Sequence, residues 1–206
     1  MPTALSRRMT LLRRRPSVPP QAFGAHWAGP HAEIARVYPG LVKYTQNHVE
    51  QRIDPAPTDA FECDGMAELW FPDQSAMRAA LTSPVTNALI EDEQRFLDGV
   101  TGMLLDEADL DDGRGGVKII VLGRTRAGAT VDATAPTQAT HGSTARVVST
   151  WSRPALWSIP EPPDTVLVAR FADAPAAHAA LNPTAWPALG ALAMWHAYRV
   201  REVHVV

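Results

Sequence analysis

The sequence predicts an α+β fold in which two β-α-β-β-α-β units follow one another and close into a barrel within one chain. The expected elements before an acidic, glycine-rich linker at 111–116 make up one complete unit, and those after the linker repeat the unit in outline. An internal repeat at a constant offset of 100 residues supports the same fold. The repeated residues are Phe71, Asp73, Ala79, Ala80 and Leu81, which recur as Phe171, Asp173, Ala179, Ala180 and Leu181.

The repeat indicates a tandem duplication, with a first unit at 1–110, the linker at 111–116 and a degenerate second unit at 117–206. Each unit has the ferredoxin-like arrangement, in which helices cover one face of the sheet and leave the other bare. The bare faces of two such sheets cover each other when they close into a barrel. We therefore expect an intrachain α+β barrel, a pseudo-dimer, whose interior is large enough for a small ligand. Pairing of whole chains as a homodimer is compatible with this fold.

The bulk composition indicates a globular protein without a general affinity for nucleic acids or membranes. Of the 206 residues, 46% are hydrophobic, and the formal net charge of −3 gives no drive towards anionic partners. The single cysteine, Cys63, cannot form an internal disulfide, which fits a reducing compartment. No apolar run reaches the length of a membrane span, and the apolar stretch between the arginines at 7–8 and 13–15 is too short for a signal peptide. We expect a cytoplasmic protein.

The first unit begins with an expected strand at 8–15, which Pro16 ends, followed by a helical pattern that continues to residue 38. Aromatic and apolar residues of this helix recur at steps of three and four, so they share one face. They are Phe23, Trp27, His31, Ile34 and Tyr38. Gly29-Pro30 interrupts this face and predicts a kink or a restart, because proline removes a backbone donor.

The remaining elements follow from hydrophobic alternation, alanine-rich runs and prolines. The first unit continues with a strand at 41–49, a loop at 51–60 containing Pro55 and Pro57, a strand at 65–71, helices at 73–82 and 86–101, and a strand at 102–109. The second unit has expected strands at 117–122, 145–151, 165–171 and 197–206, a helix at 173–181 and a poorly defined stretch at 185–196. Between 125 and 143 the composition turns to Ala, Thr and Gly, so the first helix of this unit is shortened or lost.

Several spaced residues of the first unit form a recognisable pattern. An Arg-x-Pro follows the first strand, then come Phe-x-x-x-Trp-x-x-x-His, a Tyr on the second strand and Asp-Glu-x-x-x-Phe near the end of the unit. The residues are Arg14, Pro16, Phe23, Trp27, His31, Tyr44, Asp92, Glu93 and Phe96. This pattern resembles that of the EthD family, named for ethyl tert-butyl ether degradation, within the dimeric α+β-barrel superfamily. The resemblance covers roughly residues 8–110 and continues beyond 116 only in outline.

The resemblance implies a fold more firmly than a function. Relatives include proteins that accompany oxidative degradation pathways, lactone isomerases, and cyclases or dehydratases of polyketide-type rings, which generally work without a metal or organic cofactor. In the methylmuconolactone-isomerase branch, the spacing of a histidine and a tyrosine matches His31 and Tyr44. The cysteine of that branch falls at Leu69, and Cys63 lies on the preceding loop, so the resemblance does not transfer thiol chemistry.

His31 and Tyr44 are the candidate catalytic residues. A neutral imidazole accepts a proton next to a carbonyl, and a phenol donates a hydrogen bond to the oxygen on which charge develops. Alternation along 41–49 places Gln46 and His48 on the same strand face as Tyr44. The alternative for His31 is a packed, hydrogen-bonded histidine of the core.

Four further residues are candidates for substrate binding, namely Arg14, Trp27, His48 and Asp92. Arg14 offers a fork for a carboxylate or an enolate, but a solvated arginine or a partner of Asp92 is the favoured structural alternative. Trp27 is favoured as a core residue, and His48 has the alternative of a solvated strand end. Asp92 lies in an acidic run typical of a solvated helix face, and the resemblance makes it a partner of the histidine or of the arginine. His26, off the apolar face, is expected to be exposed.

Two functions remain open. The first is a cofactor-independent isomerase, cyclase or lyase that acts by proton transfer on a small hydrophobic carbonyl, lactone or polyketide-like compound in a barrel pocket. His31 is then the acid and base, and Tyr44 the donor to the oxyanion. The alternative is a non-catalytic accessory protein that binds such a compound, which the degenerate second unit favours. The histidines lack metal-ligand spacing and no dinucleotide fingerprint occurs, so we expect neither metal nor cofactor.

Overall fold

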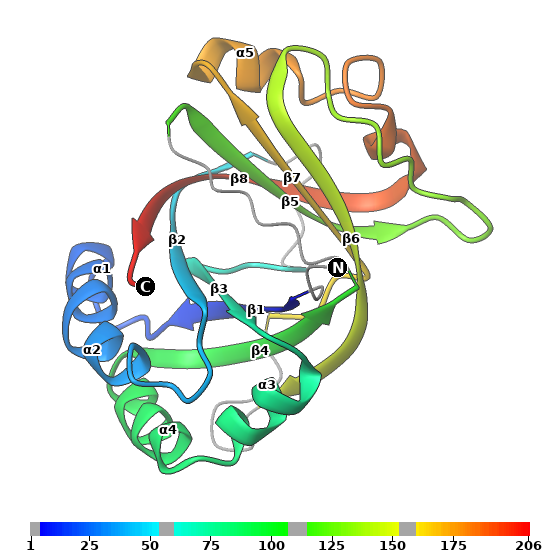
Figure 1. The fold of residues 1–206 in the computed structure, drawn as a ribbon. Helices are drawn as coiled ribbons and strands as arrows, with labels where there is room; N and C mark the ends of the chain where they lie inside the picture. Colours follow the sequence, from blue (N-terminus) through cyan, green and yellow to red (C-terminus); the bar gives the residue numbers. More distant parts are fainter. Residues whose placement is uncertain (1–4, 54–59, 107–114, 153–159) are drawn as a thin grey trace.

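The described residues, 5–53, 60–106, 115–152 and 160–206, form an α+β barrel in this computed structural model (Figure 1). The first half contains β1 (Ser6–Arg14), α1 (Pro20–His26), η1 (Trp27–His31), α2 (Ala32–Ala35), β2 (Lys43–Ile53), β3 (Gly65–Phe71), α3 (Gln74–Leu81), α4 (Pro84–Phe96) and β4 (Leu97–Leu105). The second half contains β5 (Val117–Thr125), β6 (Ala139–Ser152), β7 (Thr165–Phe171), α5 (Ala174–Ala179), η2 (Pro187–Ala191) and β8 (Leu192–His204). None of the described helices is long and apolar enough to cross a membrane.

The strands of the two halves occupy equivalent places in the barrel. The order around it is β1-β3-β2-β8-β5-β7-β6-β4, and all described pairings are antiparallel. The first half contributes β4-β1-β3-β2 and the second β8-β5-β7-β6, which is the same order of equivalent strands. The halves join where β2 pairs with β8 and where β4 pairs with β6. The predicted fold class, two ferredoxin-like units closed within one chain, is confirmed.

Equivalent aspartates make the same local contacts in both halves. Asp73 and Asp173 begin α3 and α5, each by accepting a hydrogen bond of 2.8 Å from the backbone N–H three residues later. Asp64 and Asp164 each accept a hydrogen bond of 2.9 Å from the backbone N–H of the last residue of β1 or β5. These contacts support the predicted repeat. The unit boundaries stay a prediction, because 107–114 lies outside the described residues.

Three strands begin five or six residues before the prediction, and one of them is β6, which begins at Ala139 rather than at 145. The sequence predicts a helix over 86–101, but β4 already begins at Leu97, because this stretch pairs with β1. The last strand begins at Leu192 rather than at 197, because β8 pairs with the whole length of β5. The predicted loop at 51–60, with Pro55 and Pro57, falls largely outside the described residues. Its first residues belong to β2, which continues to Ile53.

The middle of the barrel is packed, which corrects the expectation of a ligand-sized hollow there. Apolar side chains from strands of both halves fill it, with 0–2% of their surface exposed. They are Met9, Leu11, Met66, Met103, Ile120, Leu122, Val166, Val168 and Tyr198. Strand alternation predicts which residues face inward, but not that side chains from opposite walls meet and leave no space between them.

The amino-terminal helices pack on the outer face of the first-half sheet (Figure 1). Phe23 and Trp27 from the helices and Tyr44, Ala67 and Leu69 from the strands share one buried apolar cluster. The equivalent segment of the second half, 126–138, contains no helix, as the composition predicts. The buried layer that holds the predicted site residues therefore lies outside the barrel, between helices and sheet.

Candidate active site

A π-helical turn shapes the segment that carries the first candidate residues. This turn, η1, lies between α1 and α2 and contains Pro30. Proline has no N–H to donate and its ring crowds the preceding turn, so the helix widens locally instead of continuing as a regular α-helix. The two ends of the turn, Trp27 and His31, both lie on the buried side, with 0% and 6% exposure. The break predicted at Gly29-Pro30 is therefore a π turn.

His31 is held by a buried carboxylate from α4. Its Nδ1 lies 2.9 Å from Oδ2 of Asp92, and Nε2 of His26 lies 3.0 Å from each oxygen of the same carboxylate. Burial acts to raise the pKa of Asp92, but hydrogen bonds with His31 and His26 outweigh it and hold the pKa below its ordinary value. Asp92 is thus a partner of His31, one of the two partners expected. His26 is half-buried, so its predicted exposure is wrong.

This contact sets the chemistry of the His31 ring. When Nδ1–H donates to the Asp92 carboxylate, Nε2 of His31 carries the lone pair and is the proton acceptor. No described residue forms a hydrogen bond with this Nε2. A base whose second nitrogen is fixed by a carboxylate is the arrangement that orients histidine for proton transfer.

Tyr44 is held as a hydrogen-bond donor. Its hydroxyl oxygen accepts hydrogen bonds from Trp27 Nε1 at 3.1 Å and from Gln46 Nε2 at 3.0 Å. Gln46 Nε2 also donates to the carbonyl oxygen of Trp27 at 2.7 Å, which fixes the amide. Burial raises the pKa of Tyr44 to about 12, so the phenol keeps its proton at neutral pH. With both lone pairs engaged, the hydroxyl hydrogen has no acceptor among the described residues.

His48 contacts two residues of this network, Gln46 and Trp27. Its Nε2 lies 3.1 Å from Oε1 of Gln46, and its ring lies against Trp27 with 4.5 Å between the centroids. His48 is 6% exposed, so the alternative of a solvated strand end is wrong. Burial, helped by the charge of Arg201, lowers the pKa of His48 to about 4, and the ring is neutral at neutral pH.

His31 and Tyr44 line one small cavity between the helices and the sheet. Its volume is about 30 Å³, which is enough for about one water molecule. The lining residues are Arg8, Thr10, Leu12, Trp27, His31, Ala35, Tyr38, Tyr44, Ala67, Leu69, Leu89 and Glu93. Of the predicted substrate-binding residues, Trp27 contributes to the lining, whereas His48 and Asp92 act on residues that do.

Two charged residues of this cavity were not among the residues predicted for the site. Arg8 on β1 and Glu93 on α4 are each 4% exposed. Arg8 belongs to an arginine-rich start that is typical of a solvated terminus, which concealed its burial in the sheet. Glu93 is part of the Asp-Glu pattern and follows Asp92 directly, but only the helix geometry shows that it faces the cavity. His26 is the third missed residue, through its contact with Asp92.

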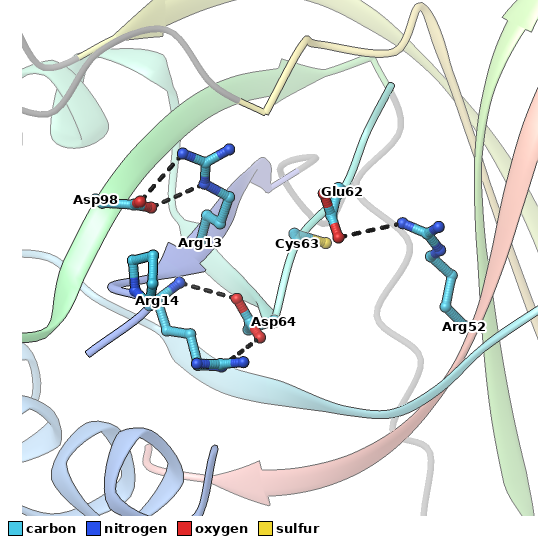
Figure 2. A pocket seen from close by; sticks show the side chains of 8 residues that line it. Arg13, Arg14, Arg52, Glu62, Cys63, Asp64 and Asp98 are labelled. Carbon is cyan, nitrogen blue, oxygen red and sulfur yellow. Dashed lines mark hydrogen bonds and ion pairs between the residues drawn. The ribbon is translucent and has the colours of Figure 1, made fainter. Parts of the chain in front are cut away.

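Arg14 lies away from this cavity, at one end of the barrel (Figure 2). It lines a pocket of about 450 Å³ in which arginines face carboxylates. The ion pairs are Arg13–Asp98 at 2.8 Å, Arg14–Asp64 at 2.9 Å and Arg52–Glu62 at 3.5 Å. The alternative of Asp92 as the partner of Arg14 is therefore wrong. Cys63 also lines this pocket, where burial raises the pKa of its thiol far above the ordinary value.

Comparisons with known proteins agree with this architecture. Residues 15–99 match the model of the EthD domain. None of the curated proteins matches the chain. Among solved structures, an anthrone oxidase-like protein is similar over 98% of this chain and 94% of its own, with a TM-score of 0.65 and 8% identity. A putative monooxygenase from Lactobacillus acidophilus NCFM covers 98% of this chain and 95% of its own, with a TM-score of 0.52 and 8% identity.

A third solved structure resembles the first half alone. An ethyl tert-butyl ether degradation family protein from Bacillus halodurans c-125 is 24% identical over 50% of this chain and 98% of its own, with a TM-score of 0.39. The anthrone oxidase-like protein and the putative monooxygenase, with TM-scores of 0.65 and 0.52, show a shared fold and no more. Among the described residues, no group of three or more His, Cys, Asp or Glu side chains is arranged to hold a metal ion.

Proposed function

We propose that the protein catalyses proton transfer on a small, largely apolar carbonyl or lactone compound, as an isomerase, cyclase or lyase; the match of residues 15–99 to the model of the EthD domain supports this. One observation carries the proposal. His31, oriented by the buried carboxylate of Asp92, and Tyr44, held as a hydrogen-bond donor, line the same buried cavity. Packing alone does not require either arrangement.

The residues divide the reaction between them. Nε2 of His31 takes a proton from the carbon next to the carbonyl, and the C–H electron pair moves to form an enolate. The hydroxyl of Tyr44 donates its hydrogen bond to the enolate oxygen, where the charge develops. The imidazolium, stabilised by Asp92, then returns the proton to another carbon or to a leaving group. This sequence completes an isomerisation or an elimination without net consumption of a proton.

The size of the cavity sets a condition on binding. About 30 Å³ holds one water molecule and not an organic substrate of many atoms. The wall opposite the sheet is made of helices, with Leu89 on α4 and Ala35 at the end of α2. Binding therefore requires outward movement of this helical layer, a motion that also admits the substrate and closes over it.

Hydrogen exchange measures the proposed step directly. The full-length protein is incubated in D₂O with 2-tetralone, an enolisable ketone, and with a panel of small lactones, and loss of the α-hydrogen signals is followed by NMR. His31→Ala is expected to lower the exchange rate by about 10²- to 10⁴-fold. His178→Ala, at an exposed position on α5, is the matched control and keeps the wild-type rate.

The non-catalytic alternative predicts a different result. A binding protein retains these compounds, with line broadening or chemical-shift changes in the same NMR samples, but exchanges their hydrogens no faster than buffer. An exchange rate that His31→Ala leaves unchanged removes His31 from the mechanism. Either result refutes the proposed function.

A further inference from the structure

Arg8, a charged residue that lines the cavity, has no role in the proposed mechanism, and a residue of the second half of the barrel contacts it. Resting on the proposed function, we infer that Arg8 binds the oxygen atoms of an enolate and that Trp151, from the second half, positions it. The substrate class is then narrowed to compounds whose enolised form carries two neighbouring oxygens, such as 1,3-dicarbonyl compounds and β-keto esters. A guanidinium fork matches such a pair of oxygens.

Arg8 lies in the centre of the first-half sheet. It pairs with Leu69 of β3 on one side and with Leu104 of β4 on the other, and its side chain lines the same cavity as Tyr44. The charge of Arg8 lies near enough to the phenol to act against the rise in the pKa of Tyr44. A cation and a phenol O–H therefore face one buried space, where electrostatic interactions are stronger than in water.

Contacts with Thr10 and Trp151 help to orient the guanidinium. Nε of Arg8 donates to Oγ1 of Thr10 at 3.2 Å, on the same strand face. The ring of Trp151 lies 5.2 Å from the Arg8 Cζ atom, within the range of a cation–π interaction. Trp151 is on β6, so a residue of the second half holds a charged residue of the first-half cavity.

The sheet is shaped to admit this indole. Gly102 on β4 pairs with Trp151, and a Cβ atom at Gly102 would lie 2.2 Å from the indole Cε2 atom. Any larger residue would displace the ring from the sheet. Trp151 also packs on the apolar cluster of the first half, beneath the helices. The close approach of the indole to Gly102 on β4 thus determines where the Trp151 ring lies.

The charges in the site match those that the reaction creates. Proton transfer produces an imidazolium at His31, next to the Asp92 carboxylate, and an enolate next to Arg8 and Tyr44. Each new charge meets an opposite charge or a donor that is already in place, which is the condition for electrostatic stabilisation of a transition state. Glu93 lines the same cavity, so an acid accompanies the buried cation before substrate binds.

A pair of ligands of similar size tests the inference. Pentane-2,4-dione is an open-chain compound whose enolised form places its two oxygens side by side, whereas pentan-2-one has a single oxygen. Calorimetric titration of the full-length protein is expected to show a preference for the dione of roughly 10- to 100-fold. Arg8→Met is expected to remove this preference while it changes pentan-2-one affinity by no more than about twofold. Arg8→Lys retains the charge without the fork and is expected to retain part of the preference.

Variants at Trp151 test the positioning role. Trp151→Ala is expected to lower dione affinity by about three- to tenfold, and Trp151→Phe, which keeps a flat ring over the guanidinium, restores it. Arg78→Met, at an exposed position on α3, is the control for loss of a positive charge. If Arg8→Met does not fold, Arg8→Lys and the two Trp151 variants carry the test.

The outcomes separate this inference from the proposed function. A wild-type protein that binds both compounds equally, or neither, overturns the inference, as does a preference that survives at Arg8→Met or is undiminished at Arg8→Lys. The titrations measure ligand binding and do not require catalytic turnover, so they test the Arg8 site independently of the proposed reaction. A preference that disappears at Arg8→Met, together with an exchange rate that His31→Ala leaves unchanged, supports the Arg8 site and refutes the proton-transfer function.

Discussion

Burial moves two side chains near the cavity away from their ordinary titration ranges. His48 stays neutral and Tyr44 stays protonated across the pH range in which most proteins are folded. The sequence identified both positions, because strand alternation and the spaced pattern place them on one face. It could not show that Gln46 connects them by hydrogen bonds, since this depends on side-chain geometry and not on spacing.

His48 is expected to make stability depend on mildly acidic pH. Its pKa is about 4 in the folded protein against 6.5 for the model compound, so the unfolded chain binds the proton first. The stabilisation is present above pH 6.5 and is lost as the pH falls through about 4, for a total of about 3 kcal/mol. Urea unfolding at a series of pH values measures it, and His48→Gln should flatten the profile between these limits. An unchanged profile in that variant contradicts the assignment.

Tyr44→Phe separates the chemical role of the phenol from its role in packing. The variant leaves the indole of Trp27 without its acceptor and removes one of the two acceptors of the Gln46 amide, at a cost of about 1–3 kcal/mol in unfolding free energy. It should also lower the α-hydrogen exchange rate by about 10²-fold or more, through loss of the donor to the enolate. Tyr198→Phe removes a buried hydroxyl from the barrel interior and should lower stability alone. Equal exchange rates in the two variants would exclude a chemical role for Tyr44.

At the scale of elements, the helical face at 23–38 could be predicted and its π turn could not. Steps of three and four residues identify the buried face, and Gly29-Pro30 identifies the break. Whether proline kinks a helix, ends it or widens one turn depends on which outcome buries the neighbouring side chains best. Here the wide turn buries Trp27 and His31 against the sheet.

Two glycines near this turn provide a matched pair of substitutions. A Cβ atom on Gly65 would lie 2.4 Å from Cζ3 of the Trp27 ring, so Gly65→Ala is expected to cost about 1–3 kcal/mol and to displace the ring that donates to Tyr44. A Cβ atom on Gly29 meets nothing within 4 Å, so Gly29→Ala is expected to be neutral or to stabilise by up to about 1 kcal/mol. Thermal unfolding of both variants, with indole fluorescence as a second signal, tests the difference. A smaller loss at 65 than at 29 would contradict the proposed close approach.

At the scale of the whole molecule, closure of the barrel could be predicted and the content of its interior could not. The internal repeat and the bare sheet faces predict a closed barrel, because each unit needs a cover for the open face of its sheet. The apolar middle and a charged cluster at one end depend on which side chains meet across the barrel. In this cluster, Glu68 lies 2.6 Å from Lys118 Nζ and also contacts Arg7, so ion pairs connect the two halves.

Loss of the Glu68 charge is expected to loosen the contact between the halves. Burial acts to raise the pKa of Glu68, but the charges of Lys118 and Arg7 outweigh it and hold the pKa far below the ordinary 4.5. The stabilisation is therefore present above pH 4.5 and is lost progressively below it. Glu68→Gln removes the carboxylate that pairs with buried Arg7 and leaves Lys118 with Glu202, and it should cost about 3–5 kcal/mol in urea unfolding.

The exposed pair of Glu33 and Arg36 is the control for this prediction. Their side chains are 64% and 48% exposed, and Glu33→Gln is expected to change stability by less than about 1 kcal/mol. Losses of similar size in Glu33→Gln and Glu68→Gln would show that the buried cluster contributes no more than a surface ion pair.

Two barrel halves that lie in one chain free the site from two-fold symmetry. In a dimer of identical units, every substitution occurs twice, at positions that cannot specialise separately. Here the register of the strands gives Tyr44 an equivalent in Gly142, and Arg8 an equivalent in Ile119. All described residues that line the cavity come from the first half, and the second half supports it from outside, through the contact of Trp151 with Arg8.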